Sequence, residues 1–381
     1  MNIDEMNLDE LRAGINALDA TIQDAFSQRM ELCKGVARYK QRNGMQIFQT
    51  AREKEILDRI RSNAPEGLGA SSSLLFQTIM DISKYLQYRE IHQQNTPYDF
   101  TMPNLTTTAT VACQGTAGAN AETAAKQIFG EDCQPEFMTT FADIFAAVQS
   151  GRVQYGIIPV QNSTAGSVRQ AYDLMAEYNF YIARTTIVEI TNCLAVRPGT
   201  RLEDVKDVYS HQQALAQCSH FLDAHKMTPH PYTNTATAAA MVSESTEPIA
   251  AVCSEPCAKI HGLEILASGI SDYVPNFTRF FCICKGLEVS DDADRISVML
   301  RLPHEEGSLY RLLSKFVICG LNLLKLESRP IRNGSFEVLF HLDFSGNIHD
   351  PSVVALLSDL SENLEYFKFL GNYGESSTPV E

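Results

Sequence analysis

The sequence predicts a multidomain protein with an all-α domain, a two-lobed α/β domain and a small α+β module of ferredoxin-like arrangement. Three observations lead to this prediction. Helical periodicity runs through about the first ninety residues, strand and helix signals alternate through the middle of the chain, and a βαββαβ order of signals closes it. A chain of 381 residues is long enough for two or three domains that each bury a core.

Composition argues against several classes of protein. The formal net charge of −15 disfavours nucleic acid as a partner, because phosphate binding needs a basic face, but a few inward-facing cations still suit an anionic small molecule. The N-terminus lacks a signal-peptide pattern and no apolar run approaches the ~20 residues that span a bilayer, so we expect a cytoplasmic protein. The ten cysteines show no metal-ligand spacing, which indicates reduced, buried side chains and no metal site.

A long first helix is predicted over residues 8–39. Its apolar positions follow steps of four and three, as in a helix packed on other helices: Leu11, Ile15, Leu18, Ile22, Ala25, Leu32 and Val36. Arg29 occupies the one seam position without an apolar residue, and Lys40 lies about three turns further along nearly the same face. A buried guanidinium needs an anionic partner, and the only acid beside the seam is Glu31. We therefore favour an anion-binding role over a structural salt bridge.

Two further helices carry polar residues that suit the same site. The shorter one starts near residue 50 and contains Arg52 and Glu53. The other, over residues 71–94, places Ser83 and Gln87 one turn apart on a face that borders the core. Taken singly, each of these residues is more typical of an ordinary solvated or hydrogen-bonded side chain.

This helical region, over residues 6–93, resembles the all-helical class of chorismate mutase. The shared pattern consists of Arg12, Arg29, Lys40, Arg52, Glu53, Ser83 and Gln87. The resemblance implies that the first helices of two protomers pair, with Arg12 reaching into the partner's site. It also implies that Arg12 and Arg29 bind carboxylates, that Lys40 and Gln87 donate to the ether oxygen of chorismate, and that the other three orient the ring. A pericyclic rearrangement needs only positioning and charge stabilisation. One departure is Gln49, where members of this class often carry Asp.

The middle of the chain predicts a linker over residues 94–108 and a two-lobed domain over residues 109–286. Asn, Thr and Pro mark the linker, and alternating strand and helix signals after it predict a largely parallel sheet with ligand groups at strand ends. The second lobe is expected over residues 193–266, and the first lobe over residues 109–192 and 267–286.

Three stretches of this domain carry groups suited to an anionic ligand. Residues 161–167 join a strand to a helix N-terminus, where free N–H groups favour a carboxylate. His211 stands at a helix start, where a cap is more typical than an acid or base. Asn276–Phe280 leads into an apolar strand and offers the Thr278 hydroxyl beside the Arg279 cation. An ordinary capped loop or a surface charge is the alternative at each stretch.

Together these stretches resemble prephenate dehydratase over residues 109–286. The matching motifs are Tyr155-Gly156…Pro159, Ala165-Gly166-Ser167-Val168, Tyr209-Ser210-His211 and Asn276–Phe280. In that family two lobes, similar to type II periplasmic binding proteins, enclose the active site. The resemblance implies that Thr278 donates to the leaving hydroxyl and that Arg279 anchors a carboxylate. The other cleft residues that it implies are Asn162, Ser163, Ser210 and Gln217.

Three departures from the family pattern concern the dehydratase site. Gln161 stands where the family usually has Glu, and Asn120 and Ala121 stand where an aromatic residue and a Ser or Thr are usual. General acid catalysis contributes ~10²–10⁴ in rate, so loss of a carboxyl group is a substantial change. An alternative is therefore a phenylalanine-regulated mutase whose cleft is weakened or only binds prephenate.

The βαββαβ module over residues 295–372 resembles an ACT domain, a small amino-acid-sensing module. Two stretches match those that line phenylalanine in dehydratase-linked ACT domains, and they imply the effector residues Gly307, Ser308, Leu309, Glu327 and Ser328. Ser308 stands where Ala is usual. Asn333-Gly334 predicts a hairpin turn, and the residues past Gly371 predict a disordered tail, assigned to residues 373–381.

The whole chain thus resembles the bifunctional chorismate mutase–prephenate dehydratase family. The resemblance implies conversion of chorismate to prephenate and then to phenylpyruvate in phenylalanine biosynthesis, without a cofactor. It further implies feedback inhibition by phenylalanine and a homodimer or higher oligomer. A non-catalytic amino-acid sensor is the alternative of another class, and the set of cations in the helical region disfavours it.

Overall fold

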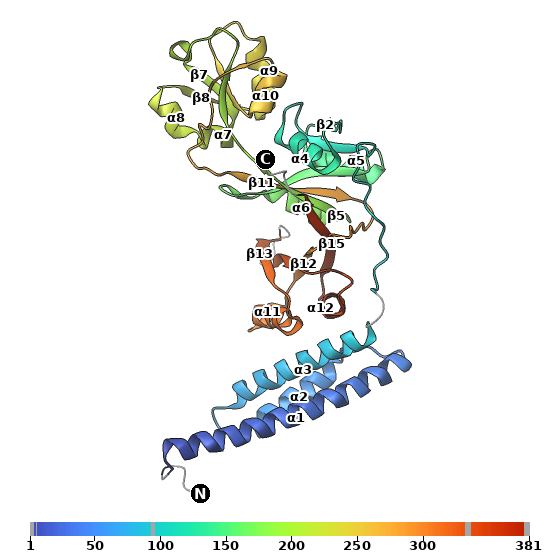
Figure 1. Cartoon of the computed structure of the whole chain (residues 1–381). Coiled ribbons are helices and arrows are strands. Elements are labelled where there is room, and N and C mark those ends of the chain that lie inside the picture. The colour runs from blue at the N-terminus through green and yellow to red at the C-terminus, as the bar shows by residue number, and fades with distance from the viewer. Residues whose placement is uncertain (1–3, 5, 93–95, 332–336, 377–381) are drawn as a thin grey trace. The chain divides into compact units, whose positions relative to one another are not determined.

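The chain divides into two compact units (Figure 1). The first consists of Met1–Asp99 and Arg295–Phe369, and the second of Phe100–Asp294 and Leu370–Glu381. The computed structural model describes residues 4, 6–92, 96–331 and 337–376. The predicted turn at Asn333-Gly334 lies outside these residues, and the finer division into domains stays a prediction.

Three helices form the N-terminal part of the first unit: α1 (Leu8–Arg42), α2 (Thr50–Asn63) and α3 (Gly69–Ile91). A capping box fixes the start of α1, because Asn7 accepts from the Glu10 N–H while the Glu10 carboxylate accepts from the Asn7 N–H. Both α1 and α2 pack against α3. The three predicted helices are confirmed.

The apolar seam predicted along α1 does not pack on the other described helices of the same chain. Leu18 and Leu32 are 64% and 74% exposed, and Ile15 and Ile22 are also exposed. The buried positions of α1 are Met30, Ala37 and Lys40. The periodicity describes a genuine apolar face, but no described part of the same chain covers it.

The C-terminal part of the first unit has the predicted βαββαβ order. Its elements are β12 (Arg295–Arg301), α11 (Ser308–Cys319), β13 (Leu323–Pro330), β14 (Val338–Ser345), α12 (Pro351–Asn363) and β15 (Phe367–Ser376). The strands lie in the order β13-β14-β12-β15, and β14 is antiparallel to both β12 and β13. Asp350 caps α12 and Pro351 occupies the first turn, a common way for a helix to begin.

The first lobe of the second unit is a mixed sheet. Its strands include β1 (Val111–Gln114), β2 (Glu136–Met138), β3 (Tyr155–Asn162), β5 (Tyr181–Glu189) and β11 (Phe277–Cys284). They lie in the order β15-β5-β11-β3-β1-β2. β1 is parallel to β2 and β3, but β11 is antiparallel to β3 and β5. The prediction of a largely parallel sheet is therefore wrong, because the strand that returns from the second lobe runs against its neighbours.

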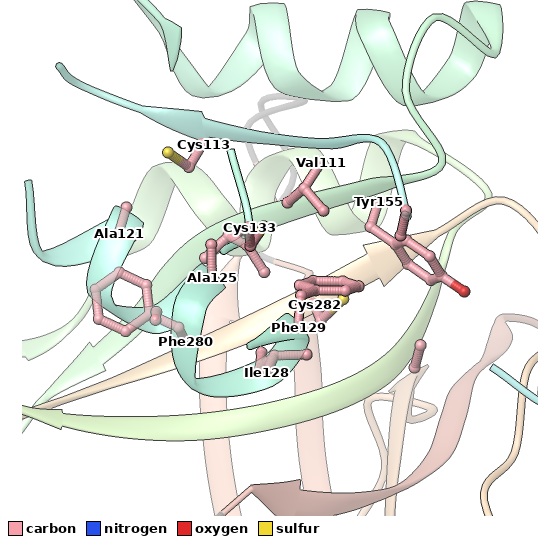
Figure 2. Packing of buried hydrophobic residues seen from close by; sticks show 14 of the residues in the cluster. Val111, Cys113, Ala121, Ala125, Ile128, Phe129, Cys133, Tyr155, Phe280 and Cys282 are labelled. Carbon is pink, nitrogen blue, oxygen red and sulfur yellow. The ribbon is translucent and has the colours of Figure 1, made fainter. Parts of the chain in front are cut away.

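Three helices pack against strands of this sheet: α4 (Asn120–Phe129), α5 (Phe141–Ser150) and α6 (Arg169–Glu177). Figure 2 shows the core formed where α4 packs on the strands, with Ala125 and Phe129 against Tyr155, Phe280 and Cys282. Phe280 and Cys282 therefore point toward α4. Because side chains alternate along a strand, this sets the face of the sheet to which each residue at the start of β11 points.

The second lobe has its own five-stranded mixed sheet. Its strands β6 (Cys193–Val196), β7 (Asp207–His211), β8 (Thr228–Tyr232), β9 (Ala250–Cys253) and β10 (Glu264–Ala267) lie in the order β10-β6-β9-β7-β8. Its helices are α7 (Gln212–Ala216), α8 (Ser219–Ala224), α9 (Thr235–Glu244) and α10 (Glu255–Ile260). The two-lobed α/β prediction is confirmed. None of the helices in the described ranges is long and apolar enough to cross a membrane.

Strand β15 corrects the prediction for the C-terminus. Its last residues belong to the second unit, where they pair in parallel with β5 from Gly374 to Ser376. Tyr373 is fully buried, and its ring meets that of Phe281 at 5.8 Å. Disorder past Gly371 is therefore wrong as far as Ser376, because backbone pairing and one aromatic anchor order this polar, glycine-containing segment.

Candidate active sites

The first candidate site lies between α1 and α3. Arg29 and Cys33 stand one turn apart on α1, with Arg29 Nη1 3.9 Å from Cys33 Sγ. The hydroxyl of Ser83 on α3 reaches the same sulfur at 2.6 Å. Cys33 therefore contacts two of the predicted residues, Arg29 and Ser83. Cys33 was not among the predicted site residues, although its spacing of one helical turn from Arg29 was a usable signal.

Lys40 and Gln87 bring buried polar groups to the same helix pair. The Lys40 ammonium donates to the Ile47 carbonyl at 2.5 Å, and desolvation lowers the pKa of Lys40 against the opposing effects of Glu53 and Cys33. The Gln87 amide donates to the Ser83 carbonyl at 3.2 Å, whereas its Oε1 is buried without a hydrogen-bond partner among the described residues. A buried amide oxygen without a hydrogen-bond partner destabilises the fold, so such an atom marks a place where a polar atom of a ligand can bind.

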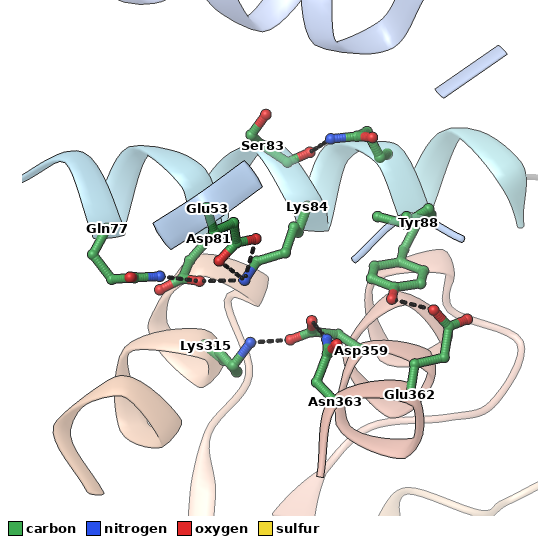
Figure 3. A network of polar contacts seen from close by, with 12 residues as sticks. Glu53, Gln77, Asp81, Ser83, Lys84, Tyr88, Lys315, Asp359, Glu362 and Asn363 are labelled. Atoms are coloured by element: carbon green, nitrogen blue, oxygen red, sulfur yellow. Dashed lines mark hydrogen bonds and ion pairs between the residues drawn. The ribbon is translucent and has the colours of Figure 1, made fainter. Parts of the chain in front are cut away.

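Glu53 is held by a buried ion network that the sequence did not reveal (Figure 3). Lys84 lies 3.1 Å from Glu53 and 3.0 Å from Asp81, and the side chains of Lys84 and Asp81 are both less than a tenth exposed. Desolvation alone would lower the pKa of Lys84, but attraction by Asp81, Glu53 and Asp359 raises it overall. The ammonium therefore stays charged and fixes the Glu53 carboxylate.

Two predicted mutase residues lie apart from this group. Arg12 pairs with Asp9 at 3.7 Å and Arg52 with Glu55 at 2.7 Å, and all four side chains are exposed. Positions 12 and 29 are 29 − 12 = 17 residues apart, which on one helix is about 26 Å. Arg12 and Arg29 of one chain therefore cannot meet in one site.

The second candidate site lies where β3 ends and β11 begins. Asn162 and Thr278 are cross-strand neighbours and both are buried. The Asn162 Nδ2 donates to Thr278 Oγ1 at 3.0 Å and to Asn276 Oδ1 at 2.8 Å. The neighbouring Ser163 hydroxyl accepts from the Phe277 N–H at 2.9 Å. The structure therefore brings three of the predicted dehydratase residues together.

Gln217 joins this group from the second lobe. Its Nε2 donates to Thr164 Oγ1 at 2.8 Å, and its Oε1 accepts from Asn276 Nδ2 at 3.2 Å. Asn276 is 1% exposed and thus links Asn162 to Gln217. Asn276 belongs to one of the matching motifs but had no predicted role, and Thr164 was not among the predicted site residues.

Ser210 and His211 lie outside the hydrogen-bonded group. Ser210 is fully buried and donates to the Val252 carbonyl at 2.6 Å, within the sheet of the second lobe. His211 caps α7 by accepting from the Gln213 N–H at 3.3 Å. The capping interpretation of His211 is confirmed.

Arg279 follows Thr278 in the strand but faces the other way. Successive side chains of a strand point to opposite faces. The Arg279 guanidinium lies 2.7 Å from the Glu375 carboxylate of β15. The structure therefore does not bring Arg279 into the group around Thr278.

The predicted effector residues divide between two places. Gly307 precedes α11 with φ +76°, and Ser308 and Leu309 line a cavity of about 520 Å³ together with Arg301, Glu305 and Phe340. Glu327 on β13 is instead paired with Arg329 at 2.7 Å and Lys325 at 3.0 Å. Ser328 follows it on the same strand, and neither of these two residues lines the cavity.

Comparison with known proteins decides the family. Residues 11–88 match the family described as chorismate mutase type II, and residues 111–287 match prephenate dehydratase. The chain is 30% identical over 367 residues to the bifunctional chorismate mutase/prephenate dehydratase of Aquifex aeolicus, covering 96% of this chain and 97% of the relative. The chain belongs to this family. It is an enzyme of phenylalanine biosynthesis with chorismate mutase and prephenate dehydratase activities.

Solved structures resemble about 70% of this bifunctional family member. A prephenate dehydratase from Arthrobacter aurescens in complex with L-Phe matches with a TM-score of 0.64 and 30% identity, over 70% of this chain and 90% of that one. A quorum-quenching acylase, GqqA, matches with a TM-score of 0.63 and 28% identity, over 71% of this chain and 98% of that one. Because a dehydratase and an acylase share this architecture, residue roles must be argued from the sites.

Proposed function

We propose that the mutase reaction takes place between α1 and α3, where Arg29 binds a carboxylate of chorismate and Lys40 and Gln87 donate to its ether oxygen. The observation that supports this most is the buried Gln87 amide with an unused oxygen. Rotation of that amide would present its NH₂ group to the substrate instead. The rearrangement moves no proton, so a compact bound conformer and donors aimed at the breaking C–O bond are enough.

The remaining mutase residues complete this site. Lys84 fixes Glu53. In this proposal Glu53 and Ser83 orient the ring and its hydroxyl. Arg52 lies on the exposed side of α2 in the single chain, and its role in orienting the ring stays a prediction.

We also propose a homodimer in which the exposed apolar face of α1 packs on a second copy. Ile15, Leu18 and Ile22 are each more than half exposed, and burying such side chains stabilises an interface by roughly 1.5–3 kcal/mol each. Pairing the long helices would bring Arg12 of one protomer to the site around Arg29 of the other. This pairing would account for Arg12, which lies about 26 Å from Arg29 along its own helix.

The mutase kcat/KM is expected to fall at alkaline pH, below the titration of an ordinary lysine. Lys40 must carry its proton to donate, and burial lowers its pKa from 10.5. In the kcat profile the fall should come at higher pH, because a bound dianion favours the charged ammonium. The measurement is prephenate formation from chorismate across the alkaline range. A kcat/KM that stays constant up to pH 10.5 would contradict the role of Lys40.

At the second site we propose that Thr278 assists departure of the prephenate hydroxyl. Decarboxylation releases CO₂ and leaves its electron pair in the ring, which expels hydroxide, and a proton converts the hydroxide to water. Since Asn162 donates to Thr278 Oγ1, the hydroxyl keeps its own hydrogen for the leaving oxygen. A threonine alkoxide is too basic to persist, so the proton is shared or relayed. Asn162, Ser163 and Gln217 orient the substrate.

We further propose that phenylalanine binds in the cavity beside α11 as an inhibitor. Leu309 and Phe340 give it an apolar wall, and Arg301 and Glu305 offer opposite charges to the carboxylate and the ammonium of an amino acid. Binding there would inhibit by favouring one of two states of the enzyme. Roles for Glu327, Ser328 and Ser210 stay predictions.

The experiment that tests these assignments is phenylpyruvate formation from prephenate, with and without saturating phenylalanine, for the unaltered chain and Gln161→Glu. We expect activity in both proteins and inhibition of both by phenylalanine. An inactive chain that Gln161→Glu restores would favour a cleft that only binds prephenate. Unchanged rates at saturating phenylalanine would reject the regulatory proposal.

A further inference from the structure

The end of strand β15 is fastened to the sheet that carries Thr278. Gly374, Glu375 and Ser376 pair with positions 184 to 186 of β5, and β5 in turn pairs with β11. Arg184 reinforces the attachment. Its Nε donates to Ser376 Oγ at 3.0 Å, and its Nη2 donates to the Glu375 carbonyl at 3.3 Å. The backbone of Glu375 is therefore held at a defined position.

From this position the Glu375 side chain reaches across β5 to β11. Its Oε2 lies 2.7 Å from Arg279 Nη1, and the two side chains are 34% and 22% exposed. Two strand spacings separate β15 from β11, so only long side chains can bridge them. The Tyr373–Phe281 ring contact, two residues earlier on β15, spans the same gap on the same face. Half-buried ion pairs are screened less by solvent than exposed ones.

Thr278 is the second residue of β11, close to the point where a loop enters the strand. Asn162 restrains it through a hydrogen bond on its own face of the sheet. On the opposite face the Arg279–Glu375 pair restrains the next residue. The strand end that carries the reacting hydroxyl is thus fastened from both sides.

We propose that Glu375 is a positioning residue of the dehydratase, acting through Arg279 on the placement of Thr278. This inference rests on the proposed role of Thr278. Under this proposal the Arg279 guanidinium holds the strand in place and does not bind a carboxylate of the substrate. The two roles differ in the kinetic parameter that they affect. Loss of positioning lowers kcat, whereas release of a substrate anchor from a competing carboxylate lowers KM.

The test is the dehydratase kcat and KM of Glu375→Ala and Glu375→Gln in the full-length chain. We expect Glu375→Ala to lower kcat ~10-fold with KM nearly unchanged, less than the ~100-fold that a 1 Å misplacement can cause. Glu375→Gln keeps an acceptor for Arg279 but loses the charge, so its kcat should be intermediate. Mutase activity of the same samples should stay unchanged, which shows that the chain is folded and dimerised.

Asp292→Asn is the matched control. Asp292 pairs with Arg184 at 2.6 Å and thus helps to hold the same strand without touching Arg279. We expect its dehydratase kcat to fall much less than that of Glu375→Ala, because Arg184 keeps its hydrogen bonds to Ser376 and the Glu375 carbonyl. An unchanged kcat in Glu375→Ala, a fall in KM alone, or an equal loss in Asp292→Asn would each overturn the proposal. Thr278→Val is assayed in parallel. Full activity of that variant would reject the role of Thr278 itself, whereas a large loss would confine the failure to the proposed role of Glu375.

Discussion

Replacing Thr278 with valine is expected to lower the dehydratase kcat by ~10²–10⁴, the range for loss of a group that transfers or shares a proton. Valine keeps the shape and the β-strand preference of threonine but removes the hydroxyl that Asn162 orients at 3.0 Å. The measurement is phenylpyruvate formation at saturating prephenate. Mutase activity of the same protein should not change, because no mutase residue lies in the second unit.

Thr228→Val provides the control for this substitution. Thr228 lies on β8 and is exposed, so the same chemical change there leaves the site untouched. A Thr278→Val enzyme that retains a kcat within tenfold of the unaltered chain would show that another group delivers the proton. In that case the Asn162–Thr278 hydrogen bond would stabilise the fold without taking part in the reaction.

Local patterns predicted most of the helices and strands, and they also pointed to the loops that carry the sites. Asn162, Ser163 and Thr278 meet because two strand ends meet, which alternating strand and helix signals can foretell. Periodicity, however, shows that a face is apolar without showing what covers it. The seam of α1 was therefore predicted to pack on other helices, but the described helices of its own chain leave it exposed.

Long-range polar partners escaped prediction for a different reason. Lys84 and Asp81 look like ordinary helix-surface charges, and their burial depends on how α3 packs. Glu375 lies 96 positions from Arg279, in a polar segment rich in glycine that has the composition of a tail. Only pairing with β5 makes it a strand, and pairing of that kind leaves little trace in the local sequence.

Replacing Arg29 with alanine is expected to lower mutase activity roughly 30- to 5,000-fold. Removing one member of a buried carboxylate–guanidinium pair costs about 2–5 kcal/mol, and each 1.36 kcal/mol is a factor of ten. Arg12→Ala should have a comparable effect if a second protomer supplies this residue. The measurement is chorismate consumption, with Arg38→Ala as a control, since Arg38 pairs with Glu90 at 2.9 Å and is exposed. Near-normal turnover of Arg29→Ala would reject the assignment of this site.

Mixing the two inactive variants tests which chain supplies Arg12. In a dimer of one Arg12→Ala and one Arg29→Ala protomer, one site receives both intact arginines and the other receives neither. Random assortment should therefore restore about a quarter of the activity of the unaltered dimer. Arg12 and Arg29 lie too far apart on one helix to act together, so restoration requires paired α1 helices. A co-refolded mixture that remains as inactive as either variant would show that Arg12 does not act across the interface, and the exposed face of α1 would then need another partner.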